Sequence, residues 1–236
     1  MTKKLFHEDS YLKECDAVIE KVNDGKFVVL NQTIFYPQSG GQLFDTGKII
    51  KEDGSEFNVV FGKQFGNDVS YEVDKEGLKE GDKVKCVLNW ERRHKMMRMH
   101  TSAHILAAVL NKESGALITG NQLGLEESRM DFNVNDFDRN LLEGFEQKAN
   151  EAICRNLEIT VSFEEREKVF ARPELFKLKD VLPKDIPVFR IVSIGNFDVQ
   201  TDGGTHVKNT SEIGKIKIIK LKNKGAENRR IYWKLE

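Results

Sequence analysis

Short alternating stretches of apolar and polar residues dominate the first third of the chain. Segments rich in Val, Ile and Phe are separated by turn-forming residues at Asn23-Asp24-Gly25, Asp53-Gly54 and Glu80-Gly81-Asp82. The segments predict strands at Ala17–Val22, Lys26–Leu30, Thr33–Tyr36, Gly47–Lys51, Glu56–Phe61, Val69–Val73 and Lys83–Leu88. Several short strands at nearly regular spacing favour a small β-barrel.

The pattern changes at Trp90, where apolar residues begin to recur every three or four positions. No Gly or Pro interrupts residues 90–112, and the apolar positions are Met96, Met99, Ala103, Leu106 and Leu110. This spacing predicts an amphipathic helix that begins at Trp90 and runs to about Lys112. Gly115 is expected to end it.

The remainder of the chain predicts further strands and a second helix. The helix is capped by Asn135 or Asp136 and runs to about Asn156. Strands are expected at Arg129–Phe132, Ile159–Phe163, Val188–Ile194, Lys215–Leu221 and Arg229–Leu235, the last two flanking a Lys224-Gly225 turn. The predicted fold class is α+β, with a small N-terminal β-barrel domain over residues 1–89 and a two-layer α/β domain over residues 90–236.

Composition places the chain among globular proteins. Of its 236 residues, 39% are hydrophobic and 32% are charged, and no run approaches the roughly 18 apolar residues of a membrane span. Acidic residues follow the first Met before any signal-peptide segment, so we expect a cytoplasmic protein. The widely spaced Cys15, Cys86 and Cys154 argue against a disulfide framework and a cysteine-only zinc site.

Basic residues are concentrated in two places although the net charge is only −1. One group is Lys215, Lys217, Lys220, Lys222, Lys224, Arg229, Arg230 and Lys234, and the other is Arg92, Arg93, Lys95 and Arg98. Each group is either a solvated face or a surface that contacts phosphates.

Three histidines suggest a metal site. His100 and His104 are four residues apart on the predicted helix, so their side chains share one face. His206 follows Gly203-Gly204 far downstream, and Asp202 precedes it by four residues. Histidine nitrogens and a carboxylate oxygen are ligands for zinc. Either segment alone is also typical of an ordinary helix or loop.

A second motif, Gly40-Gly41-Gln42, follows Tyr36-Pro37. Adjacent glycines can bring backbone N–H groups close to a ligand. They are equally suited to a tight corner of a barrel. The motif lacks the lysine of a phosphate-binding loop.

Together these motifs resemble a known family. Trp90-x-Arg92-Arg93-x5-Met99-His100-Thr101-x2-His104 and Asp202-Gly203-Gly204-Thr205-His206-Val207 are similar to the editing domain of alanyl-tRNA synthetase, and especially to the free-standing alanyl-tRNA editing proteins of the AlaX family, medium-length type. Gly40-Gly41-Gln42, Arg129-Met130-Asp131-Phe132 and Asn228-Arg229-Arg230-Ile231 fit the same pattern. The resemblance covers nearly the whole chain.

The resemblance implies a zinc-dependent deacylase that acts in trans on alanine tRNA wrongly charged with serine or glycine. One position departs from the family, because Asp202 stands where its members have cysteine. Three outcomes are open: a His-His-Asp-His site, a three-histidine site with an additional open position, or a weak site that is often empty. Carboxylates do bind zinc, but they are harder ligands than thiolates.

Selectivity for serine over alanine requires recognition of the hydroxyl, because a pocket that admits serine cannot exclude alanine by size. The resemblance places the discriminating residue within residues 117–122, where Thr119, Asn121 and Gln122 are candidates. An ordinary polar turn is the alternative there. Thr101 occupies the position of the glutamate in His-Glu-x-x-His, so peptidase activity is not expected. The competing functions are a tRNA-binding module with weakened or lost catalysis and an unrelated small-molecule metallohydrolase.

Overall fold

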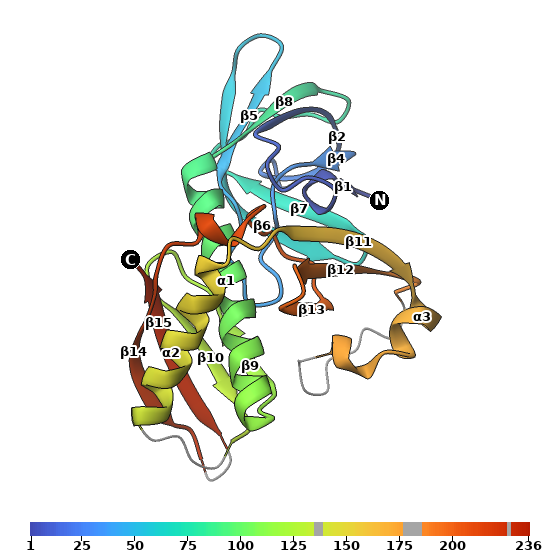
Figure 1. The fold of residues 1–236 in the computed structure, drawn as a ribbon. Helices are drawn as coiled ribbons and strands as arrows, with labels where there is room; N and C mark the ends of the chain where they lie inside the picture. Colours follow the sequence, from blue (N-terminus) through green and yellow to red (C-terminus); the bar gives the residue numbers. More distant parts are fainter. Residues whose placement is uncertain (135–138, 177–185, 226–227) are drawn as a thin grey trace. The chain divides into compact units, whose positions relative to one another are not determined.

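The computed structural model of the protein describes residues 1–134, 139–176, 186–225 and 228–236 (Figure 1). The chain divides into two compact units, Met1–Met96 and Met97–Glu236. The first contains a closed barrel and the second contains two further sheets with helices, which confirms the predicted α+β class. The domain boundary at residues 89 and 90 stays a prediction. Among the described residues, no helix is both long and apolar enough to cross a membrane.

The first unit is a six-stranded barrel in the order β2-β3-β7-β6-β5-β8. Its strands are β2 (Glu14–Asn23), β3 (Phe27–Leu30), β5 (Gly47–Lys51), β6 (Glu56–Phe65), β7 (Asp68–Val73) and β8 (Lys83–Leu88). Two short strands, β1 (Lys3–Lys4) and β4 (Gln32–Thr33), pair in parallel beside it. Alternate residues of the barrel strands face inward, and Leu30, Ile49 and Tyr71 are among those in its apolar core.

The turn between β2 and β3 shows how local sequence sets the register of the barrel. Asp24 and Gly25 have φ angles of 47° and 69°, and the Lys26 N–H donates to the carbonyl of Asn23. Asp and Gly tolerate such positive φ angles, and the turn leaves three residues between the paired Asn23 and Phe27. The predicted Asn23-Asp24-Gly25 turn is confirmed.

The predicted strand Thr33–Tyr36 is wrong beyond Thr33, where β4 ends. Residues 34–36 are buried but outside any strand. Their backbone groups are instead bonded by side chains, since the Phe35 N–H donates to the Thr33 hydroxyl and the Tyr36 N–H donates to the Asp45 carboxylate. Side-chain acceptors thus replace the ladder that the apolar run predicted.

The second unit has two antiparallel sheets. The larger follows the order β14-β15-β10-β9 and the smaller follows β11-β12-β13. Their strands are β9 (Ile118–Gln122), β10 (Ser128–Phe132), β11 (Ile159–Glu165), β12 (Val188–Ile194), β13 (Asp198–Thr201), β14 (Ile216–Asn223) and β15 (Arg229–Leu235). Helix α2 (Arg139–Cys154) packs on β14, and its Asn150 side chain bonds both backbone groups of Ile216.

Helix α1 (Trp90–Ser114) is the predicted long helix, but it is not amphipathic. Every residue from Met99 to Leu110 is buried, polar ones included. The Trp233 indole of β15 donates to the Ser102 hydroxyl at 2.9 Å, so polar positions of the helix also pack inside the unit. Gly115, with a φ of 70°, ends the helix as expected.

Among the described residues of this unit, β9, β13, the short helix α3 (Arg166–Phe170) and two 3-10 helices, Pro173–Leu175 and Thr210–Glu212, were not predicted. Strand β9 corrects the polar-turn alternative, because the candidates Thr119, Asn121 and Gln122 lie in a strand, Ile118–Gln122, that pairs with β10. The expected caps of α2 at Asn135 and Asp136 lie outside the described residues.

Candidate metal centre

His100 and His104 lie one turn apart on α1, as their spacing predicted. Their ring centroids are 5.1 Å apart, and both side chains are almost fully buried. Within this buried part of the helix an imidazole cannot rely on water as a partner. Both rings therefore need polar partners from other elements.

The loop that follows β13 supplies these partners. Asp202 is its first residue, and the Asp202 backbone exchanges hydrogen bonds with Arg190 of β12. The Gly204 N–H donates to the Asp202 carboxylate at 2.6 Å, which closes the turn that leads to His206. The turn thereby brings the side chains of Asp202 and His206 into contact with each other.

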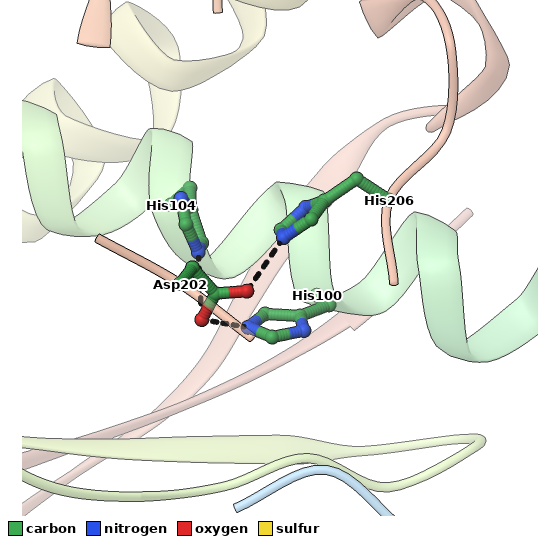
Figure 2. Close-up of side chains that lie close together, drawn as sticks. All are labelled: His100, His104, Asp202 and His206. Atoms are coloured by element: carbon green, nitrogen blue, oxygen red, sulfur yellow. Dashed lines mark hydrogen bonds and ion pairs between the residues drawn. The ribbon is translucent and has the colours of Figure 1, made fainter. Parts of the chain in front are cut away.

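The Asp202 carboxylate lies among the three imidazoles (Figure 2). One oxygen is 3.0 Å from Nε2 of His206, and the other is 3.4 Å from Nε2 of His100 and 3.8 Å from Nε2 of His104. One donor atom from each residue lies within 4.8 Å of all the others. The structure brings together all four residues that the sequence predicted as ligands.

This donor set fits a zinc ion. Zinc binds imidazole nitrogens and carboxylate oxygens at about 2.0–2.2 Å, so neighbouring donors of a tetrahedral site are about 3.3 Å apart. The distances from the two Asp202 oxygens to the nearest histidine nitrogens, 3.0 Å from one and 3.4 and 3.8 Å from the other, are close to that value. Three nitrogens and one oxygen also match the mixed ligand preference of zinc better than that of magnesium or calcium.

The protonation states favour cation binding as well. Burial alone would raise the pKa of Asp202, but the three facing imidazoles outweigh it and hold that pKa well below its usual value. Burial, with repulsion from His100, holds the pKa of His206 well below its usual value. Near neutral pH the site therefore offers an ionised carboxylate and, at His206, a neutral ring, which are the forms that bind metals.

A second layer of polar side chains contacts the outer nitrogens of two rings. The Thr101 hydroxyl is 3.1 Å from Nδ1 of His206. The Gln200 amide nitrogen is 2.8 Å from Nδ1 of His104 and also donates to the Asp198 carboxylate at 2.8 Å. Such outer partners orient the rings of metal-binding histidines.

Asp198 and Gln200 were missed by the sequence interpretation. Both lie on β13, where the buried positions are polar and the half-exposed ones include Val199. In an ordinary surface strand the apolar residues are buried and the polar ones are exposed. Because this strand has the opposite arrangement, its sequence pattern did not predict a strand. The available signal was two polar side chains at alternate positions just before Asp202.

The other predicted site residues lie outside this cluster. On β9, Asn121 pairs with the buried Met130, whereas Gln122 pairs with Arg129 and accepts a hydrogen bond from its guanidinium. Thr119 is exposed, at a bulge, with its hydroxyl 3.4 Å from the Asn228 side chain. Asn121 and Gln122 therefore lie on opposite faces of the strand, and the role of all three candidates stays a prediction.

The glycine-rich motif belongs to the first unit. Gly40 and Gly41 have φ angles of 57° and 85° and join Ser39 to Gln42 in a tight turn. Gln42 is fully buried, while Ser39 and Gly40 are exposed. The positive φ angles explain why glycine is needed here. A binding role for Gly40, Gly41 and Gln42 also stays a prediction.

Two family models match separate parts of the chain. The one described as the threonyl and alanyl tRNA synthetase second additional domain matches residues 189–232, which include Asp202 and His206. The one described as tRNA synthetases class II (A) matches residues 3–92.

Relatives match over the whole length. The chain is 49% identical to an alanyl-tRNA editing protein AlaX-M of Methanosarcina barkeri, covering 100% of this chain and 99% of that protein. It is 40% identical to the corresponding protein of Saccharolobus solfataricus, with 99% and 98% coverage. An alanine–tRNA ligase of Pyrobaculum aerophilum is 36% identical over 93% of this chain but only 25% of that enzyme. The resemblance seen in the motifs is confirmed, and the chain belongs to the AlaX family of alanyl-tRNA editing proteins.

Proposed function

We propose that this protein is a trans-acting aminoacyl-tRNA deacylase that hydrolyses alanine tRNA mischarged with serine, and with glycine as a second substrate. The observation that carries the proposal is the cluster of His100, His104, Asp202 and His206 in a member of the AlaX family. We assign these four residues as the ligands of a zinc ion.

The bond to be broken is the ester between the amino acid and the terminal ribose. When bound, zinc supplies Lewis-acid chemistry for the ester carbonyl or for an attacking water. Asp202, whose pKa lies below its usual value despite burial, would contribute the negative charge that partly neutralises the cation. No glutamate follows His100, so the chain lacks the general base of His-Glu-x-x-His peptidases at that position.

Asn121 is the best-supported candidate for reading the serine hydroxyl. It is half-buried and shares its side of the sheet with Met130, whereas Gln122 is exposed and held by Arg129. An amide shielded from water by the bound substrate loses its partner when alanine replaces serine, which gives a discrimination that size cannot provide. Thr119 is the second candidate.

The turn Ser39–Gln42 supports a second proposed contact. Because neither glycine has a Cβ, a ligand can approach the backbone N–H groups on the exposed side of the turn. We assign Gly40 and Gly41 to backbone contacts with the tRNA, and Gln42 to holding the turn from the inside.

A tRNA-binding module without catalysis was the alternative that the Asp202 substitution raised. The geometry speaks against it, because Asp202 contacts all three histidines instead of leaving a gap in the donor set. The editing relatives also make a small-molecule metallohydrolase the weaker interpretation.

The deciding experiment presents the zinc-loaded protein with alanine tRNA charged with serine, glycine or alanine and follows ester loss. We expect rapid loss of serine, slower loss of glycine and retention of alanine. His206→Ala should abolish the activity, whereas His94→Ala, another histidine of α1, should retain it. Serine loss at only the spontaneous rate, with zinc bound, would overturn the proposed function.

A further inference from the structure

The hydroxyl of Thr101 contacts the His206 ring nitrogen that is turned away from the Asp202 carboxylate. Thr101 is on α1 next to His100 and is fully buried. Its hydroxyl oxygen is 3.1 Å from Nδ1 of His206 and 2.9 Å from the Met97 carbonyl, one turn earlier in the helix. It also accepts the backbone N–H of Val207 at 3.3 Å.

A count of protons defines what this hydroxyl can do. A threonine hydroxyl has one hydrogen, and the Met97 carbonyl can only accept it. When the hydrogen points at Met97, the oxygen is free to accept a second N–H, and Nδ1 of His206 is placed to provide one. When it points at His206, Nδ1 must be the acceptor. The rotatable hydroxyl therefore serves either tautomer of the ring.

Metal binding through Nε2 requires the tautomer of His206 that carries its proton on Nδ1. Nε2 of His206 faces Asp202 at 3.0 Å and is the nitrogen on the side of the cluster. A neutral imidazole carries one proton, so an Nε2 that binds a cation leaves that proton on Nδ1. Buried as it is, the Nδ1–H group then needs an acceptor within the protein.

We propose that Thr101 is a positioning residue of the metal centre, which accepts the Nδ1–H of His206 and so holds Nε2 toward the cation. Thr101 can do this because its own hydrogen has an alternative acceptor in the Met97 carbonyl. The inference rests on the metal centre of the proposed function, but it does not depend on the identity of the substrate.

The neighbouring residue provides a matched control. Ser102 is also a fully buried hydroxyl on α1 and also donates to a helix carbonyl, that of Met99. Its oxygen accepts from the Trp233 indole instead of a histidine. Loss of the Ser102 hydroxyl removes a comparable buried hydrogen bond without touching a ligand of the metal.

The test measures zinc dissociation constants by competition with a chromophoric chelator. Thr101→Val, which keeps the shape and removes the acceptor, should weaken zinc binding about 10- to 100-fold, the usual effect of losing an outer partner of a ligand. Thr101→Ser should bind zinc nearly as tightly as the wild type. Ser102→Ala should lower the melting temperature while leaving zinc affinity unchanged.

A measurement on the wild type covers the case in which Thr101→Val does not fold. In the zinc-loaded protein, nitrogen-15 NMR should find the His206 proton on Nδ1 and slow to exchange with solvent. Rapid exchange of that proton, or an unchanged zinc affinity in Thr101→Val, would overturn the role of Thr101 alone. A wild type that binds no zinc would overturn the metal centre and this role together, whereas zinc binding without serine release would contradict only the proposed activity.

Discussion

Arg93 and Asp45 form an ion pair from which solvent is almost completely excluded, with 0% and 1% of the side chains exposed. The guanidinium also donates to the carbonyls of Ile34 and Ser10. Within the first unit, this pair ties the start of α1 to the segment that runs from β4 to β5.

Removal of one partner of this pair should destabilise the protein strongly. Arg93→Met leaves the Asp45 carboxylate buried without its cation, and such changes cost about 3–5 kcal/mol. Chemical denaturation measures the loss. Lys48→Ala breaks the solvent-exposed pair with Glu56 and should change the stability little. If the two substitutions lowered the free energy of unfolding equally, burial would not be what makes the Arg93–Asp45 pair important for stability.

Two substitutions of Asp202, to alanine and to cysteine, should change the zinc affinity in opposite directions. Asp202→Ala removes a donor and should weaken binding more than about tenfold, because even outer partners contribute 10- to 100-fold. Asp202→Cys provides a softer thiolate that donates more charge, and should strengthen it. Chelator competition gives both constants. Full zinc occupancy in Asp202→Ala at limiting zinc would show that Asp202 is not a ligand.

Selectivity should depend on Asn121 and not on its neighbour. Asn121→Ala removes the proposed partner of the serine hydroxyl, so we expect slower release of serine and a smaller preference for serine over alanine. Gln122→Ala is the matched control, since its amide bonds Arg129 on the other side of the strand. Deacylation rates on serine- and alanine-charged tRNA test this. A loss of preference in Gln122→Ala alone would reverse the assignment.

Two cysteines that look unrelated in the sequence face each other in the barrel. Cys15 on β2 pairs with Cys86 on β8. A hydrogen bond from the Cys86 thiol lowers the pKa of Cys15. In a Cys154→Ser background, Cys86→Ala should therefore raise that pKa and slow alkylation of Cys15 near neutral pH, because less thiolate is present.

Iodoacetamide labelling followed over a range of pH measures this effect. Cys86→Ser keeps a donor at the same place and should leave the labelling of Cys15 closer to that of the parent. An alkylation profile that is identical in Cys86→Ala and the parent would show that the Cys86 thiol does not influence Cys15.

Several strands were predicted well from the sequence. The bounds of β5, β8, β12 and β15 agree with the prediction because these segments are rich in β-branched, aromatic and other apolar residues and turn residues flank most of them. In contrast, β13 buries Asp198 and Gln200, and a pattern based on hydrophobicity cannot recognise a strand whose inward side chains are polar.

The same reason explains the misjudged character of α1. Its polar residues, His100, Thr101, Ser102 and His104, are buried because each has a partner on another segment of the second unit, and such partners are invisible in a local pattern. The four proposed ligands could nevertheless be predicted, since their residue types and spacing reflect chemistry more than hydrophobicity.

The order in which these ligands are synthesised has a consequence for how the protein matures. His100 and His104 leave the ribosome nearly a hundred residues before Asp202 and His206, an interval of roughly 5–20 s at ordinary rates of translation. During that time the nascent chain offers only two of the four proposed ligands, too few to complete a zinc site. In contrast to a zinc finger, whose closely spaced ligands let the ion drive folding, the proposed site is completed only once the loop after β13 has been synthesised, so we expect zinc binding to follow, and not to initiate, the folding of helix α1.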